Sequence, residues 1–188
     1  FETFLKGMFY DIKEKGIKNL IIDLRTNGGG NSRLGDMLLE YLTDKPYCQF
    51  GGGSIKFSKQ AIEQGAVHAS YDKIGKLQRF SSNDLKTPSE KPLRFDGEIY
   101  VLTSRQTFSS ATAFTSAIKD FHIGTIVGEE TGGVASSYGD VIHFNLPNSG
   151  LKCGCSHKHF LRPSGEDTGR GVIPDFEVKP EPEDLVTG

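Results

Sequence analysis

Three short apolar runs constrain the fold of this chain more than any other feature. They are NLIIDLR at 19–25, EIYVLTS at 98–104 and GTIVGEE at 124–130. Continuous apolar runs of this length are typical of strands that are covered on both faces, as in parallel sheets. Helical patterns separate the runs. Strands that alternate with helices predict an α/β domain with a mainly parallel central sheet.

The helical patterns flank these strands. Residues 2–15 carry apolar side chains at helical spacing, and Gly16 is placed to end that helix. A second helix is predicted to run from Ser32, as its cap, through Tyr41. Its inward side chains are predicted to be Leu34, Met37, Leu38 and Tyr41. A third helix is predicted over Ser109 to Asp120.

The remaining segments are less regular. Residues 51–95 are polar and interrupted by Gly and Pro, the composition of a surface excursion or flap. Within them, GGGS at 51–54 resembles a flexible linker, either natural or engineered, and SIKFSKQ at 54–60 is a candidate strand. Apolar segments at 140–147 and 151–160 flank a turn and predict a β-hairpin near the C-terminus.

Composition excludes several classes of protein. The chain has 188 residues, 36% of them hydrophobic and 24% charged, which is ordinary for a globular protein and fits one domain over 1–188. A formal net charge of −2 gives no reason to propose a nucleic-acid partner. No apolar run reaches the roughly 20 residues of a membrane-spanning helix. Three cysteines define no disulfide framework. Because the chain opens without Met or a secretion signal, we expect a mature product or an excised domain.

A glycine-rich turn follows the first predicted strand. Gly28, Gly29 and Gly30 allow a tight backbone that brings N–H groups close to a ligand oxygen. No Lys-Ser/Thr follows, so the phosphate-binding P-loop pattern fails, and three contiguous glycines do not match the dinucleotide fingerprint. An oxyanion hole needs only two convergent N–H donors. The alternative is an ordinary turn that leads into a helix.

A pair of serines follows the second predicted strand. Ser109 and Ser110 stand at the start of a predicted helix, where serine is a common cap. A serine in this place is also typical of a nucleophile elbow, in which the N–H of the next residue points at the oxyanion. In open α/β sheets, ligands bind at the carboxyl ends of the strands, where both turns lie. We therefore expect the 28–30 turn to be a neighbour of Ser109.

Four motifs in a fixed order resemble peptidase family S41, which includes the C-terminal processing and tricorn-like peptidases. They are LIIDLRTNGGG, VLTSRQTFSSATAF, IVGEETGG and GRGVIPDFEV, and they span about residues 1–180. The resemblance implies a serine peptidase core with a ClpP/crotonase-like α/β fold, a peptide or protein substrate, and no cofactor or metal. It is compatible with a secreted or cell-envelope location.

The resemblance also implies site residues. TFSSA places the family's nucleophile on Ser109, and the oxyanion hole on the N–H of Ser110 with that of Gly28 or Gly29. Processing peptidases carry a lysine base after the VGE strand, whereas this chain has Thr-Gly-Gly-Val at 131–134.

This chain therefore resembles the branch of the family whose base is a histidine. The supporting acid of that branch precedes the G-V-x-P-D segment, which implies Glu166 or Asp167. The histidine of that branch lies upstream of the first helix, in an Asp-x-His-Thr segment that is absent from residues 1–188. Because serine without a base is a poor nucleophile, we expect the base to lie outside this chain. No histidine ring is therefore expected to contact Ser109.

Two further interpretations concern a metal site and a non-catalytic function. Cys153, Cys155, His157 and His159 have a spacing that places all four on one face of a strand. Four ligands in a line cannot converge on one tetrahedral zinc ion, so surface or packed strand residues are favoured.

The rival function is a non-catalytic peptide- or ligand-binding module, since retinoid-binding repeats of the interphotoreceptor protein resemble the same family. A crotonase-like acyl-CoA enzyme does not account for the serine.

Overall fold

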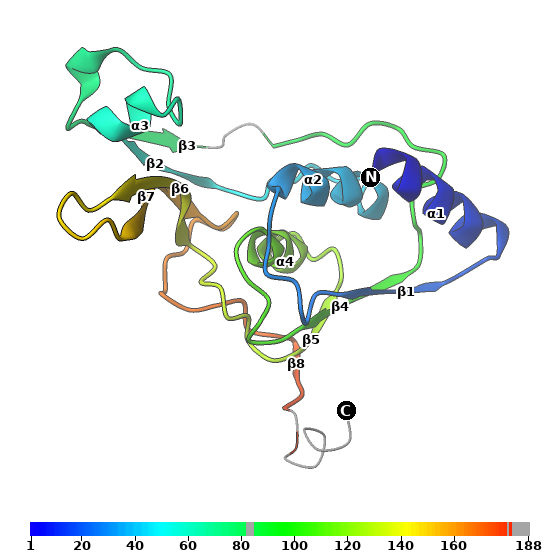
Figure 1. The fold of residues 1–188 in the computed structure, drawn as a ribbon. Coiled ribbons are helices and arrows are strands. Elements are labelled where there is room, and N and C mark those ends of the chain that lie inside the picture. Colours follow the sequence, from blue (N-terminus) through cyan, green and yellow to red (C-terminus); the bar gives the residue numbers. More distant parts are fainter. Residues whose placement is uncertain (82–84, 180, 182–188) are drawn as a thin grey trace.

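The computed structural model describes residues 1–81, 85–179 and 181 (Figure 1). Part of the predicted excursion (82–84) and the end of the predicted domain (180 and 182–188) lie outside the described residues. The helices are α1 (Glu2–Glu14), α2 (Ser32–Leu42), α3 (Lys59–Glu63), the 3-10 helix η1 (Tyr71–Lys73) and α4 (Ser110–Asp120). The strands are β1 (Asn19–Asp23), β2 (Gly52–Lys56), β3 (Leu77–Ser81), β4 (Glu98–Thr103), β5 (Thr125–Gly128), β6 (Ser137–Asn145), β7 (Lys152–Leu161) and β8 (Phe176–Glu177). Within the described part of the chain, no helix is long and apolar enough to cross a membrane.

The three predicted apolar strands form one parallel sheet, which confirms the predicted fold class. Its strand order is β1-β4-β5-β8, and every neighbouring pair is parallel. β8 was not predicted, because two residues give no periodic signal. It is held to β5 by Asp175, whose carboxylate accepts the Ile126 N–H at 2.8 Å and pairs with Lys119. Burial alone would raise the pKa of Asp175, but these donors outweigh it and lower the pKa.

Helices cover one face of the parallel sheet. Figure 1 shows α1, α2 and α4 on the same side of β1, β4, β5 and β8. The core between these layers is apolar and includes Leu5, Phe9, Leu39, Val101, Ile118 and Ile126. The prediction that the first strand is covered on both faces is wrong: Ile21, in the middle of β1, is 63% exposed. Its apolar side chains resembled those of a buried strand, but only one of its faces packs on helices.

The second helix begins differently from the prediction. Asn31, not Ser32, is its N-cap, since the Asn31 side chain accepts the Arg33 N–H at 3.0 Å. Asparagine is as good a cap as serine and stands one residue earlier. Leu34, predicted to point inward, is 40% exposed, whereas Tyr41 is buried as predicted. The first turn of α2 therefore projects past the core.

The predicted hairpin and the excursion together form a second, antiparallel sheet with the order β3-β2-β7-β6. The hairpin prediction is confirmed, with β6 and β7 paired over most of their length. The strand predicted at 54–60 is β2, which ends at Lys56 because Ser58 caps α3.

The linker interpretation of GGGS is wrong, because Gly52 and Gly53 lie inside β2 and are buried. A Cβ at Gly53 would collide with the carbonyl oxygen of His159 on the neighbouring strand. These glycines allow two backbones to approach closely, which is a different use of glycine from flexibility.

Candidate active site

The glycine turn and the serine turn are bound to each other. They follow β1 and β4, which are neighbours in the sheet, so both strands end at the same edge. The Phe108 N–H donates to the Asn27 carbonyl at 3.0 Å, and the Thr107 hydroxyl donates to the Leu24 carbonyl at 2.8 Å. Thr107 is completely buried. The two turns therefore form one rigid unit rather than two independent loops.

Gly29 packs directly against Ser109. A Cβ at Gly29 would lie 2.6 Å from the Cβ of Ser109 and 2.7 Å from the Phe108 carbonyl oxygen. Gly29 also has a φ of +99°, a region that L-residues rarely adopt. The predicted juxtaposition of the 28–30 turn with Ser109 is confirmed, and it depends on glycine at position 29.

A matched pair of alanine substitutions tests this contact. Gly29→Ala is expected to lower the free energy of unfolding by about 2 kcal/mol, because the added methyl group meets backbone and Ser109 at a strained φ. Gly28→Ala is expected to stay within about 0.5 kcal/mol of the parent, since a Cβ at Gly28 meets nothing within 4 Å. Urea unfolding of both variants measures the difference. Equal destabilisation of the two would contradict the packing described here.

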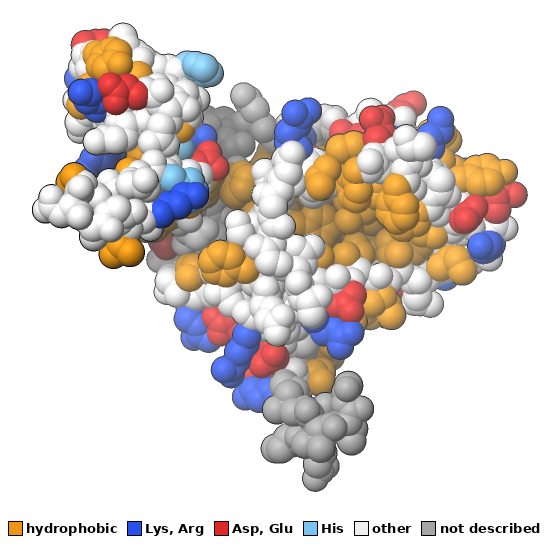
Figure 2. All heavy atoms as spheres, viewed as in Figure 1, with side chains coloured by type: hydrophobic (Ala, Val, Ile, Leu, Met, Phe, Trp, Pro, Cys, Tyr) orange, Lys and Arg blue, Asp and Glu red, His pale blue; other side chains and the backbone are white. Residues whose placement is uncertain are grey.

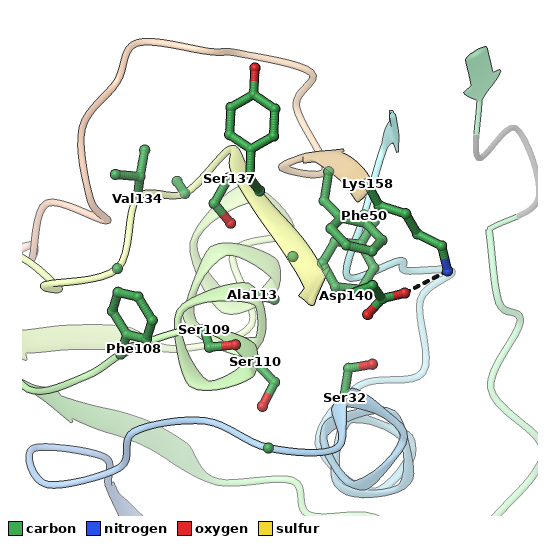
Figure 3. A pocket seen from close by; sticks show the side chains of 16 residues that line it. Ser32, Phe50, Phe108, Ser109, Ser110, Ala113, Val134, Ser137, Asp140 and Lys158 are labelled. Atoms are coloured by element: carbon green, nitrogen blue, oxygen red, sulfur yellow. Dashed lines mark ion pairs between the residues drawn. The ribbon is translucent and has the colours of Figure 1, made fainter. Parts of the chain in front are cut away.

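Ser109 has a strained backbone and an uncommitted hydroxyl. It precedes the first residue of α4 with φ 55° and ψ −124°, and its side chain caps no N–H of the helix. Such a conformation costs a non-glycine residue about 1–3 kcal/mol. The side chain is exposed and reaches into a cavity (Figure 3). Capping of the helix therefore does not explain the serine at position 109.

Backbone donors beside Ser109 differ in availability. The Gly29 N–H donates to the side-chain oxygen of Asn27 at 2.9 Å. The N–H groups of Gly28 and Ser110 donate to no acceptor within residues 1–81, 85–179 and 181. Of the two glycines that the sequence left open, Gly28 thus keeps its donor free for a ligand oxygen.

The cavity in front of Ser109 has a volume of about 280 Å³. Figure 3 shows it between the start of α4, the start of α2 and strands of the second sheet. Its walls include the aromatic side chains Phe50, Phe108 and Phe160. An ion pair between Asp140 and Lys158 stands at 2.5 Å on the side opposite Ser109. The cavity thus combines an exposed hydroxyl, apolar walls and one charged pair.

The sequence did not identify the hairpin side of this cavity. Asp140 and Lys158 carry no local motif, and Phe50 reaches the cavity only because β2 pairs with β7. The tilted contact between the Phe50 and Phe160 rings, with centroids 4.7 Å apart, follows from that pairing. Asp140 is distinguished only in the structure, where its backbone has a positive φ of 54° and its side chain lines the cavity.

No histidine is among the described residues that line the Ser109 cavity. His157 is buried, and its ring nitrogens have no hydrogen-bond partner in the described structure. His159 lies 3.4 Å from a carboxylate oxygen of Asp167 and against the ring of Tyr138. Across the described part of the chain, no hydrogen bond joins Ser109 to a histidine. In the same range, no three His, Cys, Asp or Glu side chains are grouped to hold a metal, and Cys153 and Cys155 are free thiols.

Glu166 lies beside the site rather than in it. Its carboxylate is 3.9 Å from the Arg162 guanidinium, and it lines a separate cavity of about 730 Å³. The Glu166 carbonyl oxygen accepts a hydrogen bond from the hydroxyl of Ser136. Both chain neighbours of Ser136, Ala135 and Ser137, line the Ser109 cavity. The structure thus brings Ser109, Ser110 and the glycine turn together, and leaves the carboxylates of Glu166 and Asp167 directed elsewhere.

Comparison with known proteins defines the class. The model of peptidase family S41 matches residues 2–178, so this chain belongs to that family. The fold is accordingly the ClpP/crotonase-like α/β fold of S41 peptidases, with a parallel and an antiparallel sheet.

Particular relatives include a chloroplastic C-terminal processing peptidase of Tetradesmus obliquus. It is 25% identical over 182 residues, which are 94% of this chain and 32% of that protein. The structure of the photosystem II D1 C-terminal processing protease is similar with a TM-score of 0.57 and 22% identity, covering 97% of this chain and 39% of that one. Mature CPAF in complex with lactacystin gives a TM-score of 0.65 and 20% identity, covering 94% and 42%. The chain thus spans about a third of the curated relative it matches.

Proposed function

We propose that this chain is the core of a serine endopeptidase that hydrolyses peptide bonds through an acyl-enzyme on Ser109. The observation that carries the proposal is the conformation of Ser109. Its backbone is strained, its side chain caps no helix N–H, and it packs against Gly29 at the edge of the sheet. The Ser109 hydroxyl would attack the peptide carbonyl, and the N–H groups of Gly28 and Ser110 would hold the resulting oxyanion. In this mechanism the strained backbone of Ser109 directs the hydroxyl away from the helix and toward the substrate.

The general base is proposed to be a histidine carried by a segment outside residues 1–188, before Phe1. Phe1 lines a small cavity together with Gly29 and Ser110, so the start of α1 lies beside the site. Figure 2 shows hydrophobic side chains gathered over this region, and Phe1, Phe4 and Leu34 are among the exposed ones. A segment that packs there would reach Ser109 without crossing the molecule.

The supporting acid is proposed to be Glu166 or Asp167, which follow β7 in the loop behind the cavity. Neither carboxylate is committed to a buried contact: the Glu166 side chain is 65% exposed, and that of Asp167 is 48% exposed. Each is therefore free to reorient toward a histidine supplied by the upstream segment. Of the Thr-Gly-Gly-Val stretch at 131–134, Gly133 and Val134 line the Ser109 cavity, and the stretch carries no lysine that could act as a base.

Peptide substrates are proposed to bind along β6. This strand is at the edge of the antiparallel sheet, and its residues 137–140 line the Ser109 cavity. An edge strand offers unpaired backbone groups, to which an extended peptide adds as a further strand. A peptide held there would present its carbonyl groups along the wall that faces Ser109.

A serine-reactive fluorophosphonate tests the proposal on the protein that carries its upstream segment. We expect covalent labelling of Ser109, detected by mass spectrometry of the modified peptide, and none in Ser109→Ala. Labelling requires an activated hydroxyl, so the non-catalytic binding module would remain unmodified. Absence of labelling together with peptide binding would favour that module.

A further inference from the structure

The wall of the cavity opposite Ser109 holds the two charged residues of its lining, Asp140 on β6 and Lys158 on β7. The Lys158 ammonium lies 2.5 Å from one carboxylate oxygen of Asp140. The Asp140 side chain is 49% exposed, whereas that of Lys158 is 23% exposed. A ligand that enters the cavity therefore meets the carboxylate before the ammonium.

Asp140 is turned out of the regular alternation of its strand. Gly139 pairs with Lys158, and Val141 pairs with Ser156, so the register on either side of Asp140 is unbroken. Strict alternation would place the Asp140 side chain on the face opposite Lys158. A φ of 54° instead brings the carboxylate to Lys158 and into the cavity. Aspartate tolerates this conformation better than most residues, but the conformation is still uncommon.

Lys158 is not placed to serve as the general base of the serine. Figure 3 shows Asp140 between the Lys158 ammonium and the part of the cavity that holds Ser109 and Ser32. A base must lie within hydrogen-bond reach of the hydroxyl from which it takes the proton. The Lys158 ammonium also contacts the Asp140 carboxylate, and an ammonium has no lone pair to accept a proton. Lys158 instead holds Asp140 in its turned conformation.

We propose that Asp140, held by Lys158, is a specificity-determining residue that binds the cationic group of a basic substrate side chain in the Ser109 cavity. Lys158 contacts Oδ2, which leaves Oδ1 as an acceptor for a guanidinium or ammonium. The rings of Phe50 and Phe160, which contact each other at a tilt of 37°, line the same cavity and suit the stem and flat face of arginine. The inference rests on the proposed function for the nature of the substrate, a peptide.

The test is peptide binding to the 188-residue chain, measured by fluorescence anisotropy. One arginine is moved through each position of a labelled peptide that otherwise contains alanine and glycine, and citrulline replaces it in matched control peptides. Citrulline has nearly the same shape as arginine and no charge. At one position or more, arginine is expected to bind at least about tenfold more tightly, as for a charge-assisted hydrogen bond. The preference should weaken as salt is added.

Asp140→Asn is expected to bring the arginine-to-citrulline ratio close to one, while Asp72→Asn keeps the ratio of the parent. Asp72 makes a matched control because it is an exposed aspartate that pairs with Lys76, and neither residue lines the cavity. Asparagine also tolerates positive φ, so Asp140→Asn should retain the fold, which thermal melting checks. An unchanged ratio in Asp140→Asn, no arginine preference in the parent, or a preference for glutamate would each overturn the proposal.

Binding separates this inference from the peptidase proposal, because it requires no hydrolysis. Arginine selectivity that depends on Asp140, combined with no phosphonate labelling of Ser109, would remove the peptidase function and leave the binding site. Labelling of Ser109 without any arginine selectivity would retain the peptidase and remove the role of Asp140. The two failures are thus distinguishable, because labelling is measured on the protein that carries its upstream segment and binding is measured on residues 1–188.

Discussion

Replacing Ser109 with alanine is expected to lower peptide hydrolysis at least about 10⁴-fold in the protein that carries its upstream segment. Alanine has no nucleophile, and an acyl-enzyme then cannot form. The melting temperature should change little, because the Ser109 side chain is exposed and caps no helix N–H. Hydrolysis of a fluorogenic peptide and thermal unfolding are measured on the same preparations.

Ser110→Ala is the matched control and should retain most of the activity. The proposed role of Ser110 uses its backbone N–H, which alanine keeps, and Ser110 already lies within α4. Loss of hydrolysis in Ser110→Ala with activity retained in Ser109→Ala would reverse the assignment. The nucleophile would then be Ser110, and the oxyanion donor would move to the N–H of Ala111.

The parallel sheet was predictable because its signal is local. Each of β1, β4 and β5 is a short apolar run followed by a turn, and such runs have few alternatives in a chain of this composition. The sequence also predicted that the 28–30 turn and Ser109 lie close together, because neighbouring parallel strands end at the same edge of a sheet. What periodicity could not show was how many faces of β1 are covered, since exposure of Ile21 depends on where the helices pack.

The second sheet was only half predictable. The hairpin of β6 and β7 has a local turn, whereas the pairing of β2 with β7 joins segments far apart in the chain. Without that pairing, Gly52 and Gly53 look like a linker, although the pairing is what requires their missing side chains.

The same long-range pairing determines how much of the candidate site could be predicted. It brings Phe50, on the segment before β2, to Phe160 and so completes one wall of the Ser109 cavity. Ser109 and the glycine turn have local motifs, while the Asp140 conformation is a dihedral angle that composition does not encode.

Which N–H groups are available as the proposed oxyanion donors likewise could be seen only in the structure. The sequence motif presents Gly28 and Gly29 as equivalent, but the side chain of Asn27 accepts the N–H of Gly29 and so distinguishes them. Side-chain bonds of this type form over two residues and are common for asparagine in turns. Which donor remains free is therefore decided by the rotamer of one neighbouring side chain.

Residues 1–188 alone are expected to cleave peptides about 10⁴–10⁶-fold more slowly than the protein with its upstream segment. The glycine turn, the strained serine and the cavity are all contained in this chain, so substrate binding and the oxyanion donors should persist. Removal of the proton from the Ser109 hydroxyl should be lost, because no hydrogen bond links Ser109 to a histidine in the described residues. What remains is the stabilisation that the oxyanion hole supplies without a base.

Casein labelled with a self-quenched dye reports cleavage without knowledge of the natural substrate. The matched comparison is the longer protein in which the proposed upstream histidine is changed to alanine. Its cleavage rate should fall to the level of residues 1–188. Substantial cleavage by residues 1–188 would show that the base lies inside this chain. His159, which is paired with Asp167 behind the cavity wall, would then be the first candidate to change to glutamine. Loss of that cleavage in His159→Gln would make the site self-contained and move its base to the hairpin.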